Sequence, residues 1–129
     1  MGRHNLSSGT KWEPIVGYSQ AVRVGNTVYV SGTVAINDGG EVVYPGNAGE
    51  QARFILKKIK TVLANAGAEL ADVVRTRIYL VNIDDWEAVG QAHAEYFSAI
   101  RPATTIVEVL HLIAPGLMVE IEAEAVIEP

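Results

Sequence analysis

The chain has 129 residues, of which 49% are hydrophobic, and its formal net charge is −5 because 15 acidic residues outnumber 10 Lys and Arg. This acidic balance argues against a general nucleic-acid or anionic-membrane binder, because phosphate contacts need clustered Lys and Arg. The absence of cysteine excludes a disulfide framework, a thiolate metal site and a cysteine nucleophile. The length fits one domain over residues 1–129. Without a signal-like or membrane-spanning apolar run, we expect a cytoplasmic protein.

The first third of the chain is rich in β-forming residues and turns. Residues 1–14 are polar and predict an irregular arm or a short edge strand. Two β-rich runs, at residues 18–24 and 26–35, meet at a Gly-Asn pair and predict a hairpin. The Asn-Asp-Gly-Gly turn signal at residues 37–40 is followed by a predicted short strand at residues 41–44.

The clearest predicted helix begins after Asn47. This residue is a favourable N-cap, Glu50 stands three residues later, close to a capping box, and Gly67 supplies a left-handed end. One apolar stripe at helical spacing comprises Ala52, Ile55, Leu56, Ile59, Val62, Leu63 and Ala66. The pattern predicts a helix that packs against a sheet.

The second half of the chain predicts a strand, a helix and two further strands. The strands cover residues 73–81, 104–110 and 117–127. Asp84 is the predicted N-cap of the second helix, which ends before Pro102. One face of that helix carries Trp86, Val89, His93 and Phe97. The predicted fold class is therefore α+β, a mostly antiparallel six-stranded sheet with two helices on one face.

Alternation along the strands predicts a polar second face on this sheet. In the last strand, Glu120, Glu122 and Glu124 alternate with apolar residues. In the strand at residues 73–81, one face receives Val74, Thr76, Ile78 and Leu80, and the other receives Arg75, Arg77 and Tyr79. In the strand at residues 26–35, Val28, Val30 and Val34 alternate with Tyr29, Ser31 and Thr33.

The polar face has two interpretations. It is either a solvated outer surface, in which Arg75 and Arg77 neutralise the glutamates of a neighbouring strand, or an interface with other copies of the chain. A small domain with a half-covered sheet gains stability by forming oligomers. A glutamate at the rim of such an interface could act as an acid or base, because burial and neighbouring carboxylates raise its pKa.

Other patterns that would indicate chemistry are weak. No two of His4, His93 and His111 have the spacing of metal ligands, and a packed histidine is the favoured interpretation of His93. The sequence contains no nucleophile elbow, which argues against a hydrolase triad. These observations argue against a metal site and a catalytic triad.

Five short strings within residues 15–127 occur in the order and spacing of one protein family. They are Gly17-Tyr18-Ser19-Gln20-Ala21-Val22, Val30-Ser31-Gly32, Val73-Val74-Arg75-Thr76, Pro102-Ala103 with Val107-Glu108-Val109, and Val119-Glu120-Ile121-Glu122-Ala123. Together they resemble the Rid (reactive intermediate deaminase), or YjgF, family.

The resemblance implies a chorismate-mutase-like fold and a homotrimer. It also implies three clefts between adjacent subunits, each binding a small-molecule metabolite. In the deaminase branch, water attacks the enamine or imine products of enzymes of amino-acid metabolism and releases ammonia and a keto acid. The resemblance implies no metal or organic cofactor for this reaction.

The residues of the family's cleft are carried over position by position. Four positions match residues that line the cleft, namely Tyr18, Ser31, Gly32 and Glu120. In the deaminases, the residue that matches Glu120 is thought to position or activate water. The resemblance thus implies that Glu120 is the catalytic residue.

Three cleft positions depart from the family pattern. Thr104 stands where the deaminase branch has an arginine that binds the substrate carboxylate bidentately. Thr33 replaces a usual glutamine, and Gly90 replaces a usual asparagine. Because threonine offers one hydroxyl and no charge, we expect the cleft to persist and the deamination of imino acids to be weak or absent.

Three functions are compatible with these observations. The first is a homotrimer whose cleft binds a small metabolite and hydrolyses an imine or enamine to a carbonyl compound and ammonia, which Glu120 favours. The second is a non-catalytic ligand-binding or regulatory module, which Thr104 favours. The third, a ribonuclease or translation inhibitor, is a label used for this family, and the acidic charge argues against it.

Overall fold

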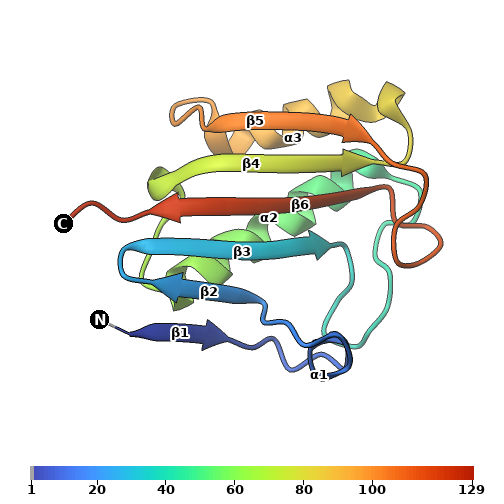
Figure 1. The fold of residues 1–129 in the computed structure, drawn as a ribbon. Coiled ribbons are helices and arrows are strands. Elements are labelled where there is room, and N and C mark those ends of the chain that lie inside the picture. Colours follow the sequence, from blue (N-terminus) through green and yellow to red (C-terminus); the bar gives the residue numbers. More distant parts are fainter. Residues whose placement is uncertain (1) are drawn as a thin grey trace.

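The computed structural model describes residues 2–129 as a mixed, mostly antiparallel sheet with two main helices on one face (Figure 1). The strands are β1 (Arg3–Leu6), β2 (Ala21–Val24), β3 (Thr27–Val34), β4 (Val73–Leu80), β5 (Ala103–Glu108) and β6 (Val119–Val126). The helices are α1 (Trp12–Val16), α2 (Ala48–Asn65) and α3 (Trp86–Phe97), with short 3-10 turns η1 (Leu70–Asp72) and η2 (Ile83–Asp85). The predicted α+β class with six strands and two covering helices is confirmed.

The six strands lie in the order β1-β2-β3-β6-β4-β5. Each neighbouring pair is antiparallel except β4 and β5, which run parallel because α3 connects them. The predicted hairpin is present as β2 and β3, with Val24 opposite Thr27. The last strand of the chain, β6, is therefore inserted in the middle of the sheet.

The core lies between the sheet and α2. Asn47 caps this helix as predicted, since its Oδ1 accepts a hydrogen bond of 3.1 Å from the Glu50 N–H. Gly67 follows the helix with a φ of +86°, the left-handed end that the sequence predicted. The whole apolar stripe of α2 is buried against the inner side chains of β3, β4 and β6. Among residues 2–129, no helix combines the length and apolar character that a membrane crossing requires.

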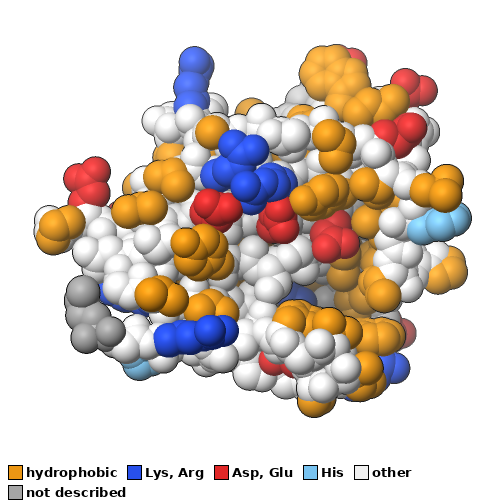
Figure 2. Space-filling model, viewed as in Figure 1, with side chains coloured by type: hydrophobic (Ala, Val, Ile, Leu, Met, Phe, Trp, Pro, Cys, Tyr) orange, Lys and Arg blue, Asp and Glu red, His pale blue; other side chains and the backbone are white. Residues whose placement is uncertain are grey.

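The opposite face of the sheet is uncovered and carries the predicted charges. Glu120, Glu122 and Glu124 point to this face, whereas the alternate residues of β6 are buried. Figure 2 shows basic and acidic side chains meeting near its centre, over β4 and β6, with hydrophobic side chains around them. The predicted polar second face is confirmed for this strand.

Two β-bulges reverse the predicted alternation on the strands that flank β6. In β4 the register with β6 shifts between Val73 and Arg75, so Val74 is 47% exposed although the alternation placed it in the core. In β3 the register shifts between Val30 and Thr33, so Thr33 is only 7% exposed and faces the helices. The predicted faces of Val74 and Thr33 were wrong because each bulge adds one residue to its strand.

The other differences from the predicted elements lie in connections. The expected strand at residues 41–44 is wrong, because this segment makes only an isolated bridge between Ile36 and Val42. Residues 1–14 contain β1, the predicted edge strand, and the start of α1, which was not predicted. Asp84 does not cap α3. Asn82 instead caps η2, by accepting a hydrogen bond from the Asp84 N–H, and α3 begins only at Trp86.

The predicted inner face of α3 is correct for most of its residues. Val89 and Phe97 are buried, and His93 is packed between the helix and the sheet. Trp86, by contrast, is 54% exposed, because it occupies the first position of the helix, beyond the end of the packed surface.

Candidate functional site

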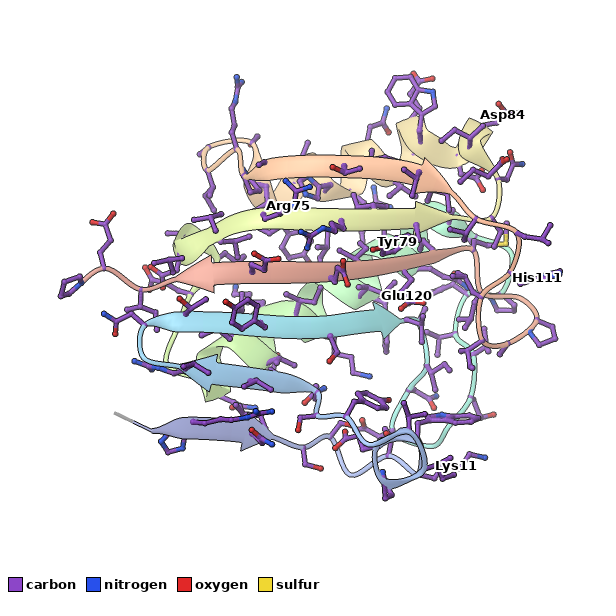
Figure 3. All side chains as sticks on the ribbon, viewed as in Figure 1. Lys11, Arg75, Tyr79, Asp84, His111 and Glu120 are labelled. Carbon is purple, nitrogen blue, oxygen red and sulfur yellow. The ribbon has the colours of Figure 1, made fainter. Side chains whose placement is uncertain are left out.

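The carboxylate of Glu120 lies over the backbone of Gly32. Glu120 is the second residue of β6, and Gly32 lies within the β-bulge of the neighbouring strand β3. A Cβ built at position 32 would overlap the Oε2 atom of Glu120. A residue without a side chain at position 32 therefore makes room for the carboxylate, which Figure 3 shows on the uncovered face of the sheet.

The surroundings of Glu120 favour its protonated form. Partial burial raises the pKa of this carboxyl above its ordinary value of 4.5, and the charge of Glu122 raises it further. Glu122, in contrast, accepts a hydrogen bond of 2.8 Å from the Tyr79 hydroxyl. A carboxyl group whose pKa is moved toward neutrality suits a general acid or base.

Tyr18 and Ser31 line an open groove, whereas Glu120 and Gly32 are not among the residues that line it. The groove has a volume of about 520 Å³ and is bounded by residues of β1, of α1 and of the loop that leads into β2. The Ser31 hydroxyl donates a 2.6 Å hydrogen bond to the Ser19 carbonyl, which fixes that loop against the bulge. Because Ser31 precedes Gly32, the structure brings Tyr18, Ser31, Gly32 and Glu120 into one region.

A residue that the sequence analysis missed holds the wall of the groove. The carboxylate of Glu13 in α1 accepts hydrogen bonds from Ser7 and from the backbone and side chain of Ser8. Burial alone would raise the pKa of Glu13, but these hydrogen bonds outweigh it and lower the pKa. No periodic pattern in the sequence indicates this role, because α1 is too short to show one.

Thr33 lies apart from this group. Its side chain faces the helices, and its hydroxyl donates a hydrogen bond of 2.8 Å to the Ser31 carbonyl. In this position Thr33 stabilises the backbone of the bulge from the side of the sheet that the helices cover. It does not reach the uncovered face that carries Glu120.

Thr104 and Gly90 lie away from these residues, on the edge strand β5 and on α3. Thr104 lies on the edge strand β5, where its hydroxyl is 2.8 Å from the Thr76 hydroxyl. Gly90 lies on α3, and no atom is within 4 Å of the place that a Cβ would occupy. Strands β6 and β4 separate Thr104 from β3, so one chain divides the predicted site residues between two places.

Arg101 does not replace the arginine that the resemblance led us to expect at position 104. Its backbone adopts a left-handed conformation with a φ of +56°, directly before Pro102. Its Nε donates a 3.1 Å hydrogen bond to the Ser98 carbonyl at the end of α3. The guanidinium is therefore directed back toward the helix.

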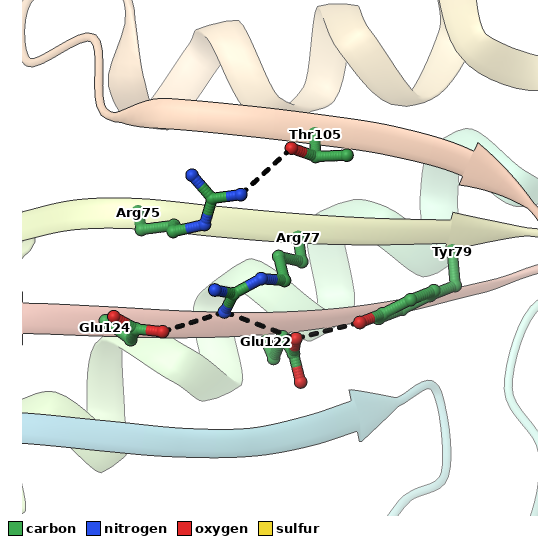
Figure 4. Close-up of polar contacts among 6 residues, drawn as sticks. All are labelled: Arg75, Arg77, Tyr79, Thr105, Glu122 and Glu124. Atoms are coloured by element: carbon green, nitrogen blue, oxygen red, sulfur yellow. Dashed lines mark hydrogen bonds and ion pairs between the residues drawn. The ribbon is translucent and has the colours of Figure 1, made fainter.

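A charge network occupies the centre of the uncovered face (Figure 4). The Arg77 guanidinium lies 2.8 Å from the Glu124 carboxylate and 3.5 Å from that of Glu122. The predicted pairing of the glutamates is thus correct for Arg77 and wrong for Arg75. Arg75 donates to the Thr105 hydroxyl at 3.2 Å, and its buried Nε has no hydrogen-bond partner within residues 2–129.

The sequence and fold were compared with known proteins. A family model described as Endoribonuclease L-PSP matches residues 9–127. The chain belongs to this family, which is also named Rid or YjgF. A crystal structure of a YjgF-family member from Mycobacterium tuberculosis is 49% identical, with a TM-score of 0.88, and the match covers 98% of this chain and 100% of that one.

Two relatives carry the names of deaminases. The 3-aminoacrylate deaminase RutC of Acinetobacter baylyi is 39% identical over 120 residues, which cover 93% of this chain and 94% of the relative. The 2-iminobutanoate/2-iminopropanoate deaminase of Rattus norvegicus is 36% identical over 127 residues, which cover 98% of this chain and 92% of the relative. Both names denote the hydrolysis of an enamine or imine.

Proposed function

We propose that this Rid-family protein hydrolyses an imine or enamine metabolite to a carbonyl compound and ammonia. The observation that carries the proposal is the Glu120 carboxyl, which lies over Gly32 and has a raised pKa. An open groove is lined by Ser31, the neighbour of Gly32 in the chain. The names of the relatives in Acinetobacter baylyi and Rattus norvegicus support the reaction type.

The proposed chemistry needs one group that accepts and then returns a proton. The ionised Glu120 carboxylate removes a proton from water while the water oxygen attacks the carbon of the protonated imine, and this forms a neutral carbinolamine. The carboxylic acid then gives that proton to the amine nitrogen. As the carbon–nitrogen bond breaks, the carboxylate takes the hydroxyl proton of the carbinolamine, ammonia leaves with a carbonyl product, and the carboxyl group passes its proton to solvent. A pKa moved toward neutrality lets one residue perform both transfers.

The complete site would be shared between copies of the chain in a homotrimer. Two observations support this proposal. The predicted site residues fall into two groups, around Glu120 and around Thr104, that lie at different places on one chain. The uncovered face also holds a partly buried charge network and the unpartnered Nε of Arg75, which a second chain could cover and satisfy.

A second candidate function is a non-catalytic ligand-binding module on the same assembly. The observation that favours it is Thr104, whose hydroxyl is engaged with Thr76 and offers no positive charge for a substrate carboxylate. On this alternative the groove beside Tyr18 would hold a ligand that undergoes no reaction.

Ammonia release decides between the two candidates. Imines would be generated in situ, from amino acids by an amino-acid oxidase and from neutral amines by an amine oxidase. We expect the protein to accelerate ammonia release from at least one class, and Glu120→Gln to reduce the acceleration by about 100-fold or more. Glu41→Gln, on an exposed turn, is the matched control. No acceleration with either class, or full activity of Glu120→Gln, would reject the enzymatic function.

A further inference from the structure

Three side chains on three different elements form a continuous hydrogen-bonded chain. The Nε2 atom of His93 in α3 is 2.9 Å from the hydroxyl of Thr76 in β4. The Thr76 hydroxyl is in turn 2.8 Å from the hydroxyl of Thr104 in β5. The Thr104 hydroxyl also lies 3.1 Å from the carbonyl oxygen of Pro102, to which it donates. Thr76 is fully buried, whereas Thr104 is exposed at the edge of the sheet.

The number of hydrogens in this chain restricts their directions. Each hydroxyl has one hydrogen, and the carbonyl of Pro102 can only accept. If Thr104 donates to Pro102, then Thr76 donates to Thr104 and the Nε2–H of His93 donates to Thr76. This order makes all three contacts and leaves no buried hydroxyl hydrogen without an acceptor.

The reverse order is the only other one that links all three side chains. Thr104 then donates to Thr76, and Thr76 donates to an unprotonated Nε2 of His93. In both orders the hydroxyl hydrogen of Thr104 is directed into the protein. A ligand oxygen can take this hydrogen only if an existing hydrogen bond breaks, whereas a ligand N–H can bond to the Thr104 oxygen without that loss.

Within residues 2–129 of one chain, neither of the basic side chains Arg101 and His93 offers Thr104 a positive charge. Arg101 is directed back to the Ser98 carbonyl, and burial lowers the pKa of His93, which keeps its imidazole neutral. A carboxylate that approached Thr104 would therefore lose water and gain neither a cation nor a free donor.

We propose that the ligand group which meets Thr104 is a neutral hydrogen-bond donor, such as the NH2 of a primary amide, and not a carboxylate. The inference rests on the proposed function, because that function places Thr104 in the cleft. The inference extends the proposed function by naming the substrate class. This class consists of carbonyl or imine compounds that carry an amide where imino acids carry a carboxylate. His93 is a positioning residue in this scheme, since it acts through Thr76.

A pair of ligands that differ in one group tests the inference. 2-Oxobutanamide and 2-oxobutanoate share a carbon skeleton and resemble the carbonyl products of the two substrate classes. Calorimetry on the full-length protein would measure both dissociation constants. We expect the amide to bind about tenfold more tightly, the effect of one hydrogen bond gained or lost. We expect Thr104→Val to bring the two constants within about threefold, and Thr104→Arg to reverse the order.

Thr105→Val is the matched control. Thr105 is the next residue of β5 and contacts Arg75 on the opposite face, so its replacement should preserve the preference for the amide. Tighter binding of the acid, equal binding of both ligands, or no binding of either would overturn the inference. The ammonia-release assay separates this outcome from failure of the proposed function. If the protein prefers the amide but hydrolyses no imine, the inference is supported and the enzymatic function is rejected. If it hydrolyses imines but prefers the acid, the enzymatic function is supported and the inference is rejected.

Discussion

The hydroxyl of Tyr79 donates a 2.8 Å hydrogen bond to the carboxylate of Glu122, and this contact holds a negative charge beside Glu120. Tyr79 stands directly opposite Glu120 in the register between β4 and β6. The same contact raises the pKa of Tyr79, so the phenol stays protonated and keeps donating. The protonation of Glu120 therefore depends, through Glu122, on Tyr79, a residue that does not itself face the groove.

Glu122→Gln should shift the pH dependence of imine hydrolysis. The charge of Glu122 is the second cause, after burial, of the raised pKa of Glu120. Its removal lowers that pKa, so the acid limb of the pH–rate profile should move to lower pH. Glu124→Gln is the control, because Glu124 does not contribute to the pKa of Glu120. An unchanged limb in Glu122→Gln would contradict the electrostatic coupling.

Glu120→Gln should stabilise the folded protein at neutral pH. The pKa of Glu120 is higher folded than its ordinary 4.5, so the folded state binds more protons between these two values. The free energy of unfolding therefore falls as pH rises through this window. Above the window the folded state carries the partly buried charge of Glu120, which destabilises it. Glutamine avoids that cost. We expect a higher Tm than wild type at pH 7 and a difference that shrinks toward pH 4.5. A lower Tm at pH 7 would show that the charged form is stabilised instead.

Gly32→Ala should remove activity and leave the fold nearly intact. The added methyl group would overlap the end of the Glu120 side chain, which is flexible and can move away. We expect a loss of imine hydrolysis close to that of Glu120→Gln, with a change in the free energy of unfolding below about 1 kcal/mol. Activity assays and thermal melts measure the two effects. Gly39→Ala, in an exposed turn, is the control, and wild-type activity of Gly32→Ala would argue against the assigned position of the carboxylate.

Arg77→Gln should weaken assembly of the proposed homotrimer. The change leaves the carboxylates of Glu122 and Glu124 without their shared cation on the face that another copy would cover. Light scattering across a dilution series should show more dissociation of this variant than of the wild type. Adding Glu124→Gln to Arg77→Gln should restore part of the lost assembly. Arg53→Gln breaks a pair between α2 and α3 and serves as the control. Equal dissociation of both single variants would place the interface elsewhere.

Gln51→Leu should be strongly destabilising although it adds apolar surface to the core. The fully buried Gln51 amide donates to the carbonyls of Tyr44 and Gly116 and accepts a 2.7 Å hydrogen bond from the Met118 N–H. Leucine would leave the buried Met118 N–H without its acceptor, while the carbonyls of Tyr44 and Gly116 would keep their bonds from the N–H groups of Asn47 and Gly46. We expect a cost on the order of 2 kcal/mol in the free energy of unfolding. Chemical denaturation measures this cost. Gln91→Leu, on the exposed side of α3, should change it by less than about 0.5 kcal/mol.

Most of the fold was predictable because its elements have strong local signals. The stripe of α2, with Asn47 at its start and Gly67 at its end, fixed that helix from the sequence alone. The alternation that places Glu120, Glu122 and Glu124 on one face of β6 was also legible, because that strand has no bulge. These elements depend on contacts near in sequence or on a strict period of two.

The errors occurred where distant contacts override local pattern. The faces of Thr33 and Val74 depend on bulges that form only when β3 and β4 pair with β6. The sequence of residues 41–44 is typical of a strand. In the structure, however, the Gln51 side chain donates hydrogen bonds to the carbonyls of Val43 and Tyr44, and Tyr44 adopts a φ of +49°. The division of the candidate site between the central strands β3 and β6 and the edge strand β5 likewise follows from the insertion of β6. A chain read in order does not reveal that insertion.

The two bulges beside β6 also limit how this chain can be recombined with its relatives. A crossover that deletes or adds one residue between Val30 and Thr33 would exchange the inner and outer side chains of the rest of β3, and the same holds between Val73 and Arg75 in β4. Chimaeric proteins should therefore tolerate a one-residue change of length in the turn at residues 25–26 and fail when the same change falls inside these two strands. In this chain each bulge acts as a single-residue insertion, and the face to which every later residue of the strand points depends on it.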